Sequence, residues 1–276
     1  MSCETKFAEY CKNGFAILRG AFDGVVVEQV LRETREVFQP VLCQYGIDAP
    51  DADGTAFDGA LEELFRRNMP AYLSAAKATQ SALALHALGV CHEMIELVRS
   101  FGIAQPLIAV RPVVHIVSDA LQVPGGYHRT PAHQDWRSVQ GSLDALVVWL
   151  PLVPVDRQFG ALEVVPGSHL DGLYKTRIDP FGNVLDDTTI EEARFVPVEV
   201  VPGDAVVFSM FTVHRTGAKQ RRGVRWAASF RYNNAASPEY AAKGYPSPFV
   251  YKSQDEILFD RSPASEDVRA IFAKRT

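Results

Sequence analysis

The segment AHQDW holds the first pair of residues in this chain whose types and spacing indicate chemistry, His133 and Asp135, two positions apart. In a β-strand both side chains would leave the same face and converge on one ion. A third ligand must come from elsewhere, and His214 is well placed, between the strand-like run AVVFSMF and a basic stretch. Two imidazoles and one carboxylate leave three coordination positions open, as a redox metal such as iron(II) needs to bind dioxygen together with a co-substrate.

Arg225 is the second indication, because the H-x-D pattern alone also occurs by chance around surface histidines. It follows His214 by eleven residues, in a strand-like run beside Trp226, where an unpaired guanidinium would be costly to bury. A dicarboxylate that chelates the metal through its 2-oxo acid end would present its far carboxylate to this two-pronged donor. The alternative is that Arg225 forms a structural salt bridge.

The elements that must position these residues change character along the chain. Residues 1–104 are predicted to be mainly helical, and 46–59, rich in Gly, Pro and Asp, to form an exposed loop. After a candidate cap at Asp23, residues recur at three- and four-residue steps: Val27, Val30, Leu31, Thr34 and Phe38. Similar spacing appears at Leu61, Leu64 and Phe65, and at Val90, Met94, Leu97 and Val98.

Residues 105–233 contain short β-type runs separated by turn residues, without the αβαβ alternation of a parallel sheet. The runs are LIAVRPVVHIV, ALVVWLPLV, ALEVV, FVPVEVV, AVVFSMF and VRWAASFRY. We therefore expect a mainly β fold with added helices, in which a double-stranded β-helix (a jelly roll, cupin-like) packs against the N-terminal helices. The chain is interpreted as one domain over 1–276, with 234–276 as a C-terminal tail or lid ending in a short helix from Glu266.

The net charge and residue composition limit the kinds of molecule that the chain is expected to bind. The 276 residues carry a net charge of −5 and 47% hydrophobic residues, which favours a globular protein without general affinity for nucleic acid or an acidic membrane. No signal peptide or spanning segment is recognisable, so a cytoplasmic location is expected. Four scattered cysteines without C-x-x-C spacing argue against a disulfide framework or a thiolate zinc site. A small-molecule substrate is expected, and no pattern specifies an oligomeric state.

The sequence resembles the phytanoyl-CoA hydroxylase-like (PhyH) family of Fe(II)/2-oxoglutarate-dependent dioxygenases. The resemblance covers about 7–232 and depends on AHQDW, on GALEVVPGSH at 160–169, on HRTG followed by Arg225, and on the opening NGFAILRGAFD. It implies Fe(II) as the metal, with 2-oxoglutarate and O2 as co-substrates. The expected reaction hydroxylates an unactivated carbon of a metabolite and releases succinate and CO2.

The resemblance also implies a role for each matching residue. His133, Asp135 and His214 would bind iron, and Arg225 with Thr216 would bind the distal carboxylate of 2-oxoglutarate. The presence of Asp135 argues for hydroxylation, since halogenating relatives replace this carboxylate with a small residue. For two further positions the alternatives stay open: His115 and Trp149 either line the co-substrate or belong to the ordinary core.

Residues beside the metal motif are candidates for substrate contacts, and two rival functions remain open. His128, Arg129, Trp136 and Arg137 are substrate-facing candidates because they lie beside the metal motif. Arg129, Arg137 and Arg157 indicate either an anionic substrate or ordinary solvated surface charges. One rival function is a cupin-like metal-dependent isomerase or hydrolase, which has no need of Arg225. The other is a catalytically silent metal-binding module.

Overall fold

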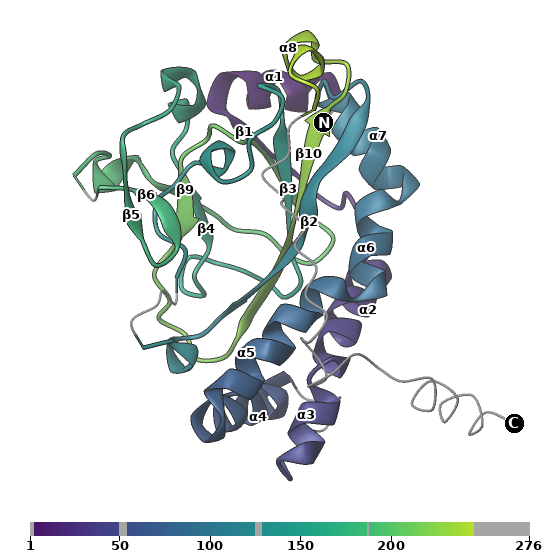
Figure 1. The fold of residues 1–276 in the computed structure, drawn as a ribbon, viewed down its shortest axis with the longest axis vertical. Helices are drawn as coiled ribbons and strands as arrows, with labels where there is room; N and C mark the ends of the chain where they lie inside the picture. Colours follow the sequence, from purple (N-terminus) through teal and green to yellow (C-terminus); the bar gives the residue numbers. More distant parts are fainter. Residues whose placement is uncertain (1–2, 50–53, 125–128, 187, 246–276) are drawn as a thin grey trace, which may run out of the picture.

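The chain forms two facing antiparallel sheets with helices on the outside of the larger one (Figure 1). The structure is a computed structural model that describes residues 3–49, 54–124, 129–186 and 188–245. The C-terminal prediction of a helix from Glu266, and most of the expected tail or lid, lie outside these residues. The predicted mainly β class with added helices is confirmed.

The larger sheet has five strands in the order β1-β8-β3-β10-β2, all paired antiparallel. Their bounds are β1 (Phe15–Leu18), β8 (Ala205–Ser209), β3 (Leu146–Pro151), β10 (Arg225–Asn234) and β2 (Pro106–Val117). The smaller sheet has the order β7-β4-β9, with β7 (Val196–Val198), β4 (Leu162–Val164) and β9 (His214–Thr216). A separate hairpin pairs β5 (Thr176–Asp179) with β6 (Gly182–Leu185).

Strand periodicity divides the larger sheet into two apolar faces. Successive side chains point to opposite faces, so Val148 and Leu150 pack against the helices, whereas Val147 and Trp149 face the smaller sheet. Along β10 the even positions Trp226, Ala228, Phe230 and Tyr232 join the helix-side core. The odd positions of β10, which begin at Arg225, therefore face the space between the two sheets.

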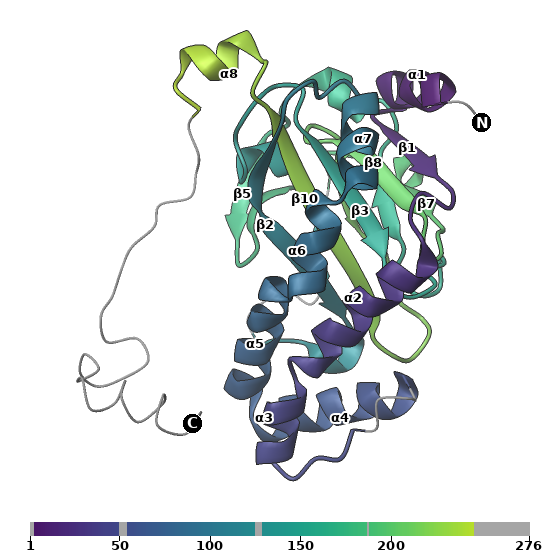
Figure 2. The ribbon, with the colours of Figure 1, turned by 90° about the vertical axis from the view of Figure 1, so that its right-hand side faces the viewer.

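The helices cover the outer face of the larger sheet, as Figure 2 shows for α2, α6 and α7. In chain order they are α1 (Cys3–Asn13), α2 (Gly24–Glu36), α3 (Gln39–Gln44), α4 (Gly54–Arg67), α5 (Met69–Ala78), α6 (Leu83–Val90), α7 (His92–Ser100) and α8 (Pro238–Ala242). The expected cap at Asp23 is confirmed, because its carboxylate accepts a hydrogen bond from the Val25 amide at 2.9 Å.

Three details differ from the sequence-based expectations. The loop predicted over 46–59 ends earlier, because α4 begins at Gly54 and buries Phe57 and Leu61 one helical turn apart. Val90 and Met94 do not share a helix, since Cys91 has extended backbone and its sulfur accepts from the Met94 amide. The β5–β6 hairpin is absent from the sequence-based expectations, because its two four-residue strands lack a clear apolar alternation.

None of the described helices is by itself long and apolar enough to span a membrane, although the bent pair Met69–Val90 and His92–Ser100 meets the length and composition test together.

Candidate metal and co-substrate site

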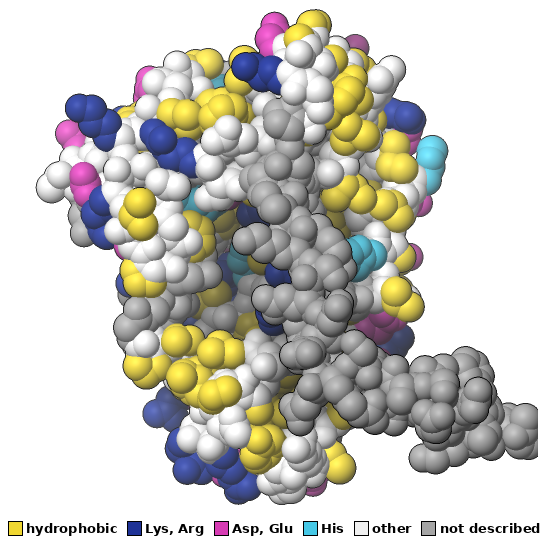
Figure 3. All heavy atoms as spheres, viewed as in Figure 1, with side chains coloured by type: hydrophobic (Ala, Val, Ile, Leu, Met, Phe, Trp, Pro, Cys, Tyr) yellow, Lys and Arg dark blue, Asp and Glu magenta, His cyan; other side chains and the backbone are white. Residues whose placement is uncertain are grey.

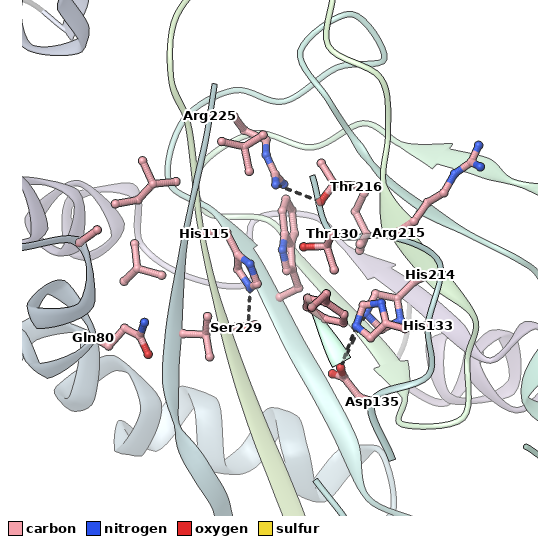
Figure 4. A pocket seen from close by; sticks show the side chains of 18 of the residues that line it. Gln80, His115, Thr130, His133, Asp135, His214, Arg215, Thr216, Arg225 and Ser229 are labelled. Atoms are coloured by element: carbon pink, nitrogen blue, oxygen red, sulfur yellow. Dashed lines mark hydrogen bonds and ion pairs between the residues drawn. The ribbon is translucent and has the colours of Figure 1, made fainter. Parts of the chain in front are cut away.

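His133, Asp135 and His214 meet between the two sheets, as the sequence predicted. Their ligand atoms all lie within 4.8 Å of one another, and all three residues are buried. The Asp135 Oδ1 lies 3.1 Å from His133 Nε2 and 4.0 Å from His214 Nε2. Figure 4 shows the three side chains pointing toward one another at one end of a cavity. This spacing suits three ligands of a single ion.

The local backbone that creates this convergence differs from the expected strand. His133 forms an isolated antiparallel bridge with His214, through a pair of backbone hydrogen bonds of 3.1 Å each. Asp135 begins a single 3-10 turn, Asp135–Arg137. The prediction that the pleat of one strand aligns His133 with Asp135 is therefore wrong. The bridge brings the two imidazoles together, and the turn places the Asp135 carboxylate close to both rings.

Both histidines have a defined tautomer. His133 Nδ1 lies 2.8 Å from the Pro131 carbonyl, and His214 Nδ1 lies 3.0 Å from the Thr212 carbonyl. A carbonyl only accepts, so each Nδ1 carries the proton and a neutral ring presents a lone pair at Nε2. Burial lowers the pKa of His214 to about 3, which keeps that ring neutral.

The donor set fits a metal cation. With Nδ1 protonated in a neutral ring, the lone pair of His133 Nε2 faces a carboxylate oxygen at 3.1 Å. Two lone pairs at this distance repel unless a proton or a cation lies between them. A divalent ion with affinity for imidazole and carboxylate satisfies all three ligands at once.

Asp135 is held as a carboxylate. Burial alone would raise its pKa, but opposing effects, led by the charge of the Arg231 guanidinium, outweigh burial and hold the pKa of Asp135 well below its usual range. Arg231 Nε donates to Asp135 Oδ2 at 2.8 Å. One carboxylate oxygen is thus engaged by Arg231, and the other faces the histidines.

Arg225 marks the other end of the cavity. Its side chain is only 1% exposed, yet no carboxylate among the described residues lies within ion-pair distance. The Arg225 Nε has no hydrogen-bond partner, and an amino group reaches the Thr216 hydroxyl at 3.4 Å. Desolvation lowers the pKa of Arg225 to about 10, so it stays charged at neutral pH. A buried cation without a counter-ion is costly and predicts a bound anion.

The remaining co-substrate candidates line the same cavity. Thr216 is buried beside Arg225, and the Arg225 guanidinium carbon lies 5.7 Å from the centre of the Trp149 ring. His115 Nε2 lies 2.9 Å from the Ser229 hydroxyl oxygen, and burial lowers the pKa of His115 to about 3. His115 and Trp149 therefore contribute to the cavity wall, and Trp149 is also part of the core between the sheets.

The cavity has a volume of about 630 Å³ and is lined largely by apolar side chains. In Figure 3 the face of the molecule is hollowed, and basic and histidine side chains show inside the hollow. The wall from β2 and the following turn is aliphatic, with Val113, Val117 and Leu121. Lys77 and Gln80 reach the cavity from the helical part of the chain. Such a space suits a small organic molecule.

The expected substrate contacts are placed differently. Arg129, Trp136 and Arg137 do not line the cavity, and His128 lies outside the described residues. Trp136 stacks on Phe211 with ring centres 5.5 Å apart, and Arg137 donates to the Tyr174 carbonyl. Arg157 is exposed on the surface. Trp136 and Arg137 follow Asp135 in the 3-10 turn, which directs their side chains toward Phe211 and Tyr174 and away from the cavity.

Two site residues, Arg231 and Ser229, were missed by sequence reasoning. Both lie on β10 and line the cavity. Both follow Arg225 at an even number of residues along the strand, so all three side chains point to the same face of the sheet. That alternation was visible in RWAASFR and would have identified them, had the strand been extended from Arg225.

Comparisons with known proteins agree with this geometry. The phytanoyl-CoA dioxygenase (PhyH) family model matches residues 10–225. The chain is 30% identical over 97 residues to 1-deoxypentalenic acid 11-beta-hydroxylase of Streptomyces exfoliatus. That match covers 32% of this chain and 34% of the relative, so it spans about a third of the relative's length.

Solved structures share the fold over nearly the whole chain. The epimerase SnoN, in complex with Fe3+, alpha ketoglutarate and nogalamycin RO, superposes with a TM-score of 0.60 at 19% identity and covers 96% of each chain. EctD from S. alaskensis, with 2-oxoglutarate and 5-hydroxyectoine, gives 0.55 at 18% identity, covering 97% of this chain and 86% of EctD. At these identities the likeness concerns the jelly-roll fold.

Proposed function

The chain belongs to the phytanoyl-CoA dioxygenase family of non-haem iron oxygenases, and from this premise we propose that it is an iron(II)- and 2-oxoglutarate-dependent oxygenase. The proposed reaction hydroxylates an unactivated carbon of a small-molecule metabolite and releases succinate and CO2. The observation that carries the proposal is the pairing, in one cavity, of a His-Asp-His cluster with a buried arginine that has no counter-ion among the described residues.

Each end of the cavity has a separate task in this proposal. His133, Asp135 and His214 hold iron(II), and Arg225 with Thr216 binds the distal carboxylate of 2-oxoglutarate. When bound, the metal and co-substrate use dioxygen to convert 2-oxoglutarate into succinate and CO2 and deliver the second oxygen atom to a substrate carbon. The protein's own contribution is to orient the groups and exclude water, so no general base is required.

The substrate is proposed to have an apolar skeleton. The aliphatic wall formed by Val113, Val117 and Leu121 offers few hydrogen-bonding groups. Lys77 lies on the same cavity, so an acidic group on the skeleton would find a cation there. The curated relative, by its name, acts on a carboxylic acid, 1-deoxypentalenic acid. A hydrophobic carboxylic acid is therefore the substrate class to screen first.

Succinate release tests the proposed activity. Metal-free protein reconstituted with iron(II) should convert 2-oxoglutarate to succinate under air, faster with a true substrate than without one. A panel of hydrophobic carboxylic acids would be screened by this signal. If iron-loaded protein neither binds nor consumes 2-oxoglutarate, the chain is a metal-dependent isomerase, a hydrolase or a silent binding module, and the proposal fails.

Isotope labelling then separates hydroxylation from other oxidations. Under ¹⁸O2 a hydroxylase places one labelled atom in the organic product and one in succinate. Some proteins of this fold are named as an epimerase and a carbocyclase, so products without added oxygen are a defined alternative outcome. Unlabelled product formed together with succinate would retain the co-substrate assignment and replace hydroxylation.

A further inference from the structure

Arg231 contacts both halves of the site. Its Nε donates to Asp135 Oδ2 at 2.8 Å, and one of its amino groups donates to the Ser229 hydroxyl oxygen at 3.1 Å. Its side chain is only 11% exposed and lines the cavity. A planar guanidinium can hold two acceptors in fixed directions at once, which a single ammonium cannot do.

Ser229 links Arg231 to His115 through hydrogen bonds of its hydroxyl group. Its oxygen accepts from Arg231, and the one acceptor that the structure records for its hydroxyl proton is His115 Nε2 at 2.9 Å. No other acceptor for the Ser229 hydroxyl proton lies among the described residues, so that proton is assigned to the hydrogen bond with His115 Nε2. Because the ring is neutral, its own proton then lies on Nδ1. His115 lines the cavity, and its Nδ1–H has no hydrogen-bond partner among the described residues.

We propose that Arg231 is a positioning residue that acts on both ends of the site. It directs Asp135 Oδ1 toward His133 and His214, and through Ser229 it keeps His115 as the tautomer that donates from Nδ1 to the co-substrate. This inference rests on the proposed function, because it assigns the donor to 2-oxoglutarate. Without Arg231, the Asp135 carboxylate can rotate about its side-chain bond. The Ser229 hydroxyl also loses the donor that fixes its direction.

The metal arm is tested by a double-mutant cycle. Arg231→Met, Asp135→Asn and the double variant would be titrated with Ni(II), which binds such donor sets more tightly than iron(II) and keeps weak variants measurable. Loss of an outer hydrogen-bond partner typically weakens metal binding about 10- to 100-fold, and we expect that for Arg231→Met. In the Asp135→Asn background the same change should cost less than about threefold, because the two residues act through one contact.

The co-substrate arm is tested in the same way at saturating Ni(II). Arg231→Met and Ser229→Ala should each weaken 2-oxoglutarate binding by about 3- to 10-fold, the size of one ordinary hydrogen bond. The double variant should be no weaker than the poorer single variant. Arg231→Lys should recover metal binding better than co-substrate binding, because it keeps the charge and loses the fork.

The controls separate this inference from the proposed function. Arg111, exposed on neighbouring β2, supplies the matched variant Arg111→Met, which should bind both ligands like the parent. A parent that binds no 2-oxoglutarate contradicts the proposed function. A parent that binds both ligands, with Arg231 variants whose effects add to those of Asp135→Asn and Ser229→Ala, contradicts the role of Arg231 alone. If Arg231→Met lowers the melting temperature, Arg231→Lys provides the decisive metal and co-substrate titrations.

Discussion

The two ends of the cavity are prepared in opposite ways. At the metal end every ligand has its second partner: carbonyls fix His133 and His214, and Arg231 fixes Asp135. At the other end Arg225 is buried with a long contact to Thr216 and no anion among the described residues. The first end presents three ligands that suit a cation, and the second presents a positive charge that suits an anion.

This difference indicates what kind of molecule bridges the two ends. A ligand that coordinates a metal at one end and carries a carboxylate at the other fits both ends, and 2-oxoglutarate has that form. Hydrogen bonds already orient the metal ligands, whereas the charge of Arg225 remains available to pair with a ligand. The cost of burying that charge alone is recovered only when the anion arrives.

Removing a metal ligand should have the largest effect. His133→Ala and His214→Ala should each weaken iron(II) binding by more than the roughly 100-fold limit of outer-partner changes and abolish iron-dependent succinate release. The fold should persist, because these residues serve the site more than the core. Metal content by elemental analysis and circular dichroism provide the measurements. Full turnover in either variant would remove that histidine from the metal site.

Asp135→Gly tests the carboxylate ligand separately. The change opens a coordination position while keeping both imidazoles. Azide added to the iron-loaded variant should then alter its visible spectrum, and the parent should respond less. Equal responses of variant and parent would argue against Asp135 as a ligand.

Arg225→Ala should affect only the anion end. Loss of one partner of a buried, charged pair costs on the order of 2–5 kcal/mol, so the dissociation constant for 2-oxoglutarate should rise about 30-fold or more. Arg225→Lys should recover part of this loss. Titration of the visible absorption band of the anaerobic iron complex measures the effect, with iron content checked in parallel. Parent-like 2-oxoglutarate binding in both variants would make the role of Arg225 wrong.

His115 lies between the two ends and predicts a pH effect. Its folded pKa of about 3 lies below the unfolded value near 6.5, so acid favours protonation of the unfolded chain. The contribution of His115 to the free energy of unfolding should therefore fall as the pH drops from 6.5 toward 3. At pH 5 this loss is at most about 2 kcal/mol. His115→Gln should flatten the pH dependence of urea unfolding, whereas exposed His86→Gln should leave it unchanged.

Thr216→Val should have the smallest effect. The contact between Thr216 and Arg225 is long, 3.4 Å, so removing the hydroxyl should weaken 2-oxoglutarate binding by no more than about fivefold. The same spectral titration measures it. A loss as large as that of Arg225→Ala would show that Thr216 itself contacts the co-substrate carboxylate.

The sequence by itself determined the residue types of the site and most of its scaffold. Short β-type runs predicted four strands of the larger sheet, β2, β3, β8 and β10, and the helical spacing after Asp23 predicted α2, because these patterns depend on local backbone geometry. The predicted ligands also converge in the structure, since the ligand atoms of His133, Asp135 and His214 all lie within 4.8 Å of one another.

Only the tertiary structure decided how those residues meet. The bridge between His133 and His214, the 3-10 turn that carries Asp135, and the contact of Arg231 with Asp135 join positions up to 96 residues apart. Such contacts depend on sheet register and on the path of loops, which local spacing does not encode. The same holds for the surroundings of Arg225, because whether a carboxylate lies beside it among the described residues depends on how every neighbouring element packs.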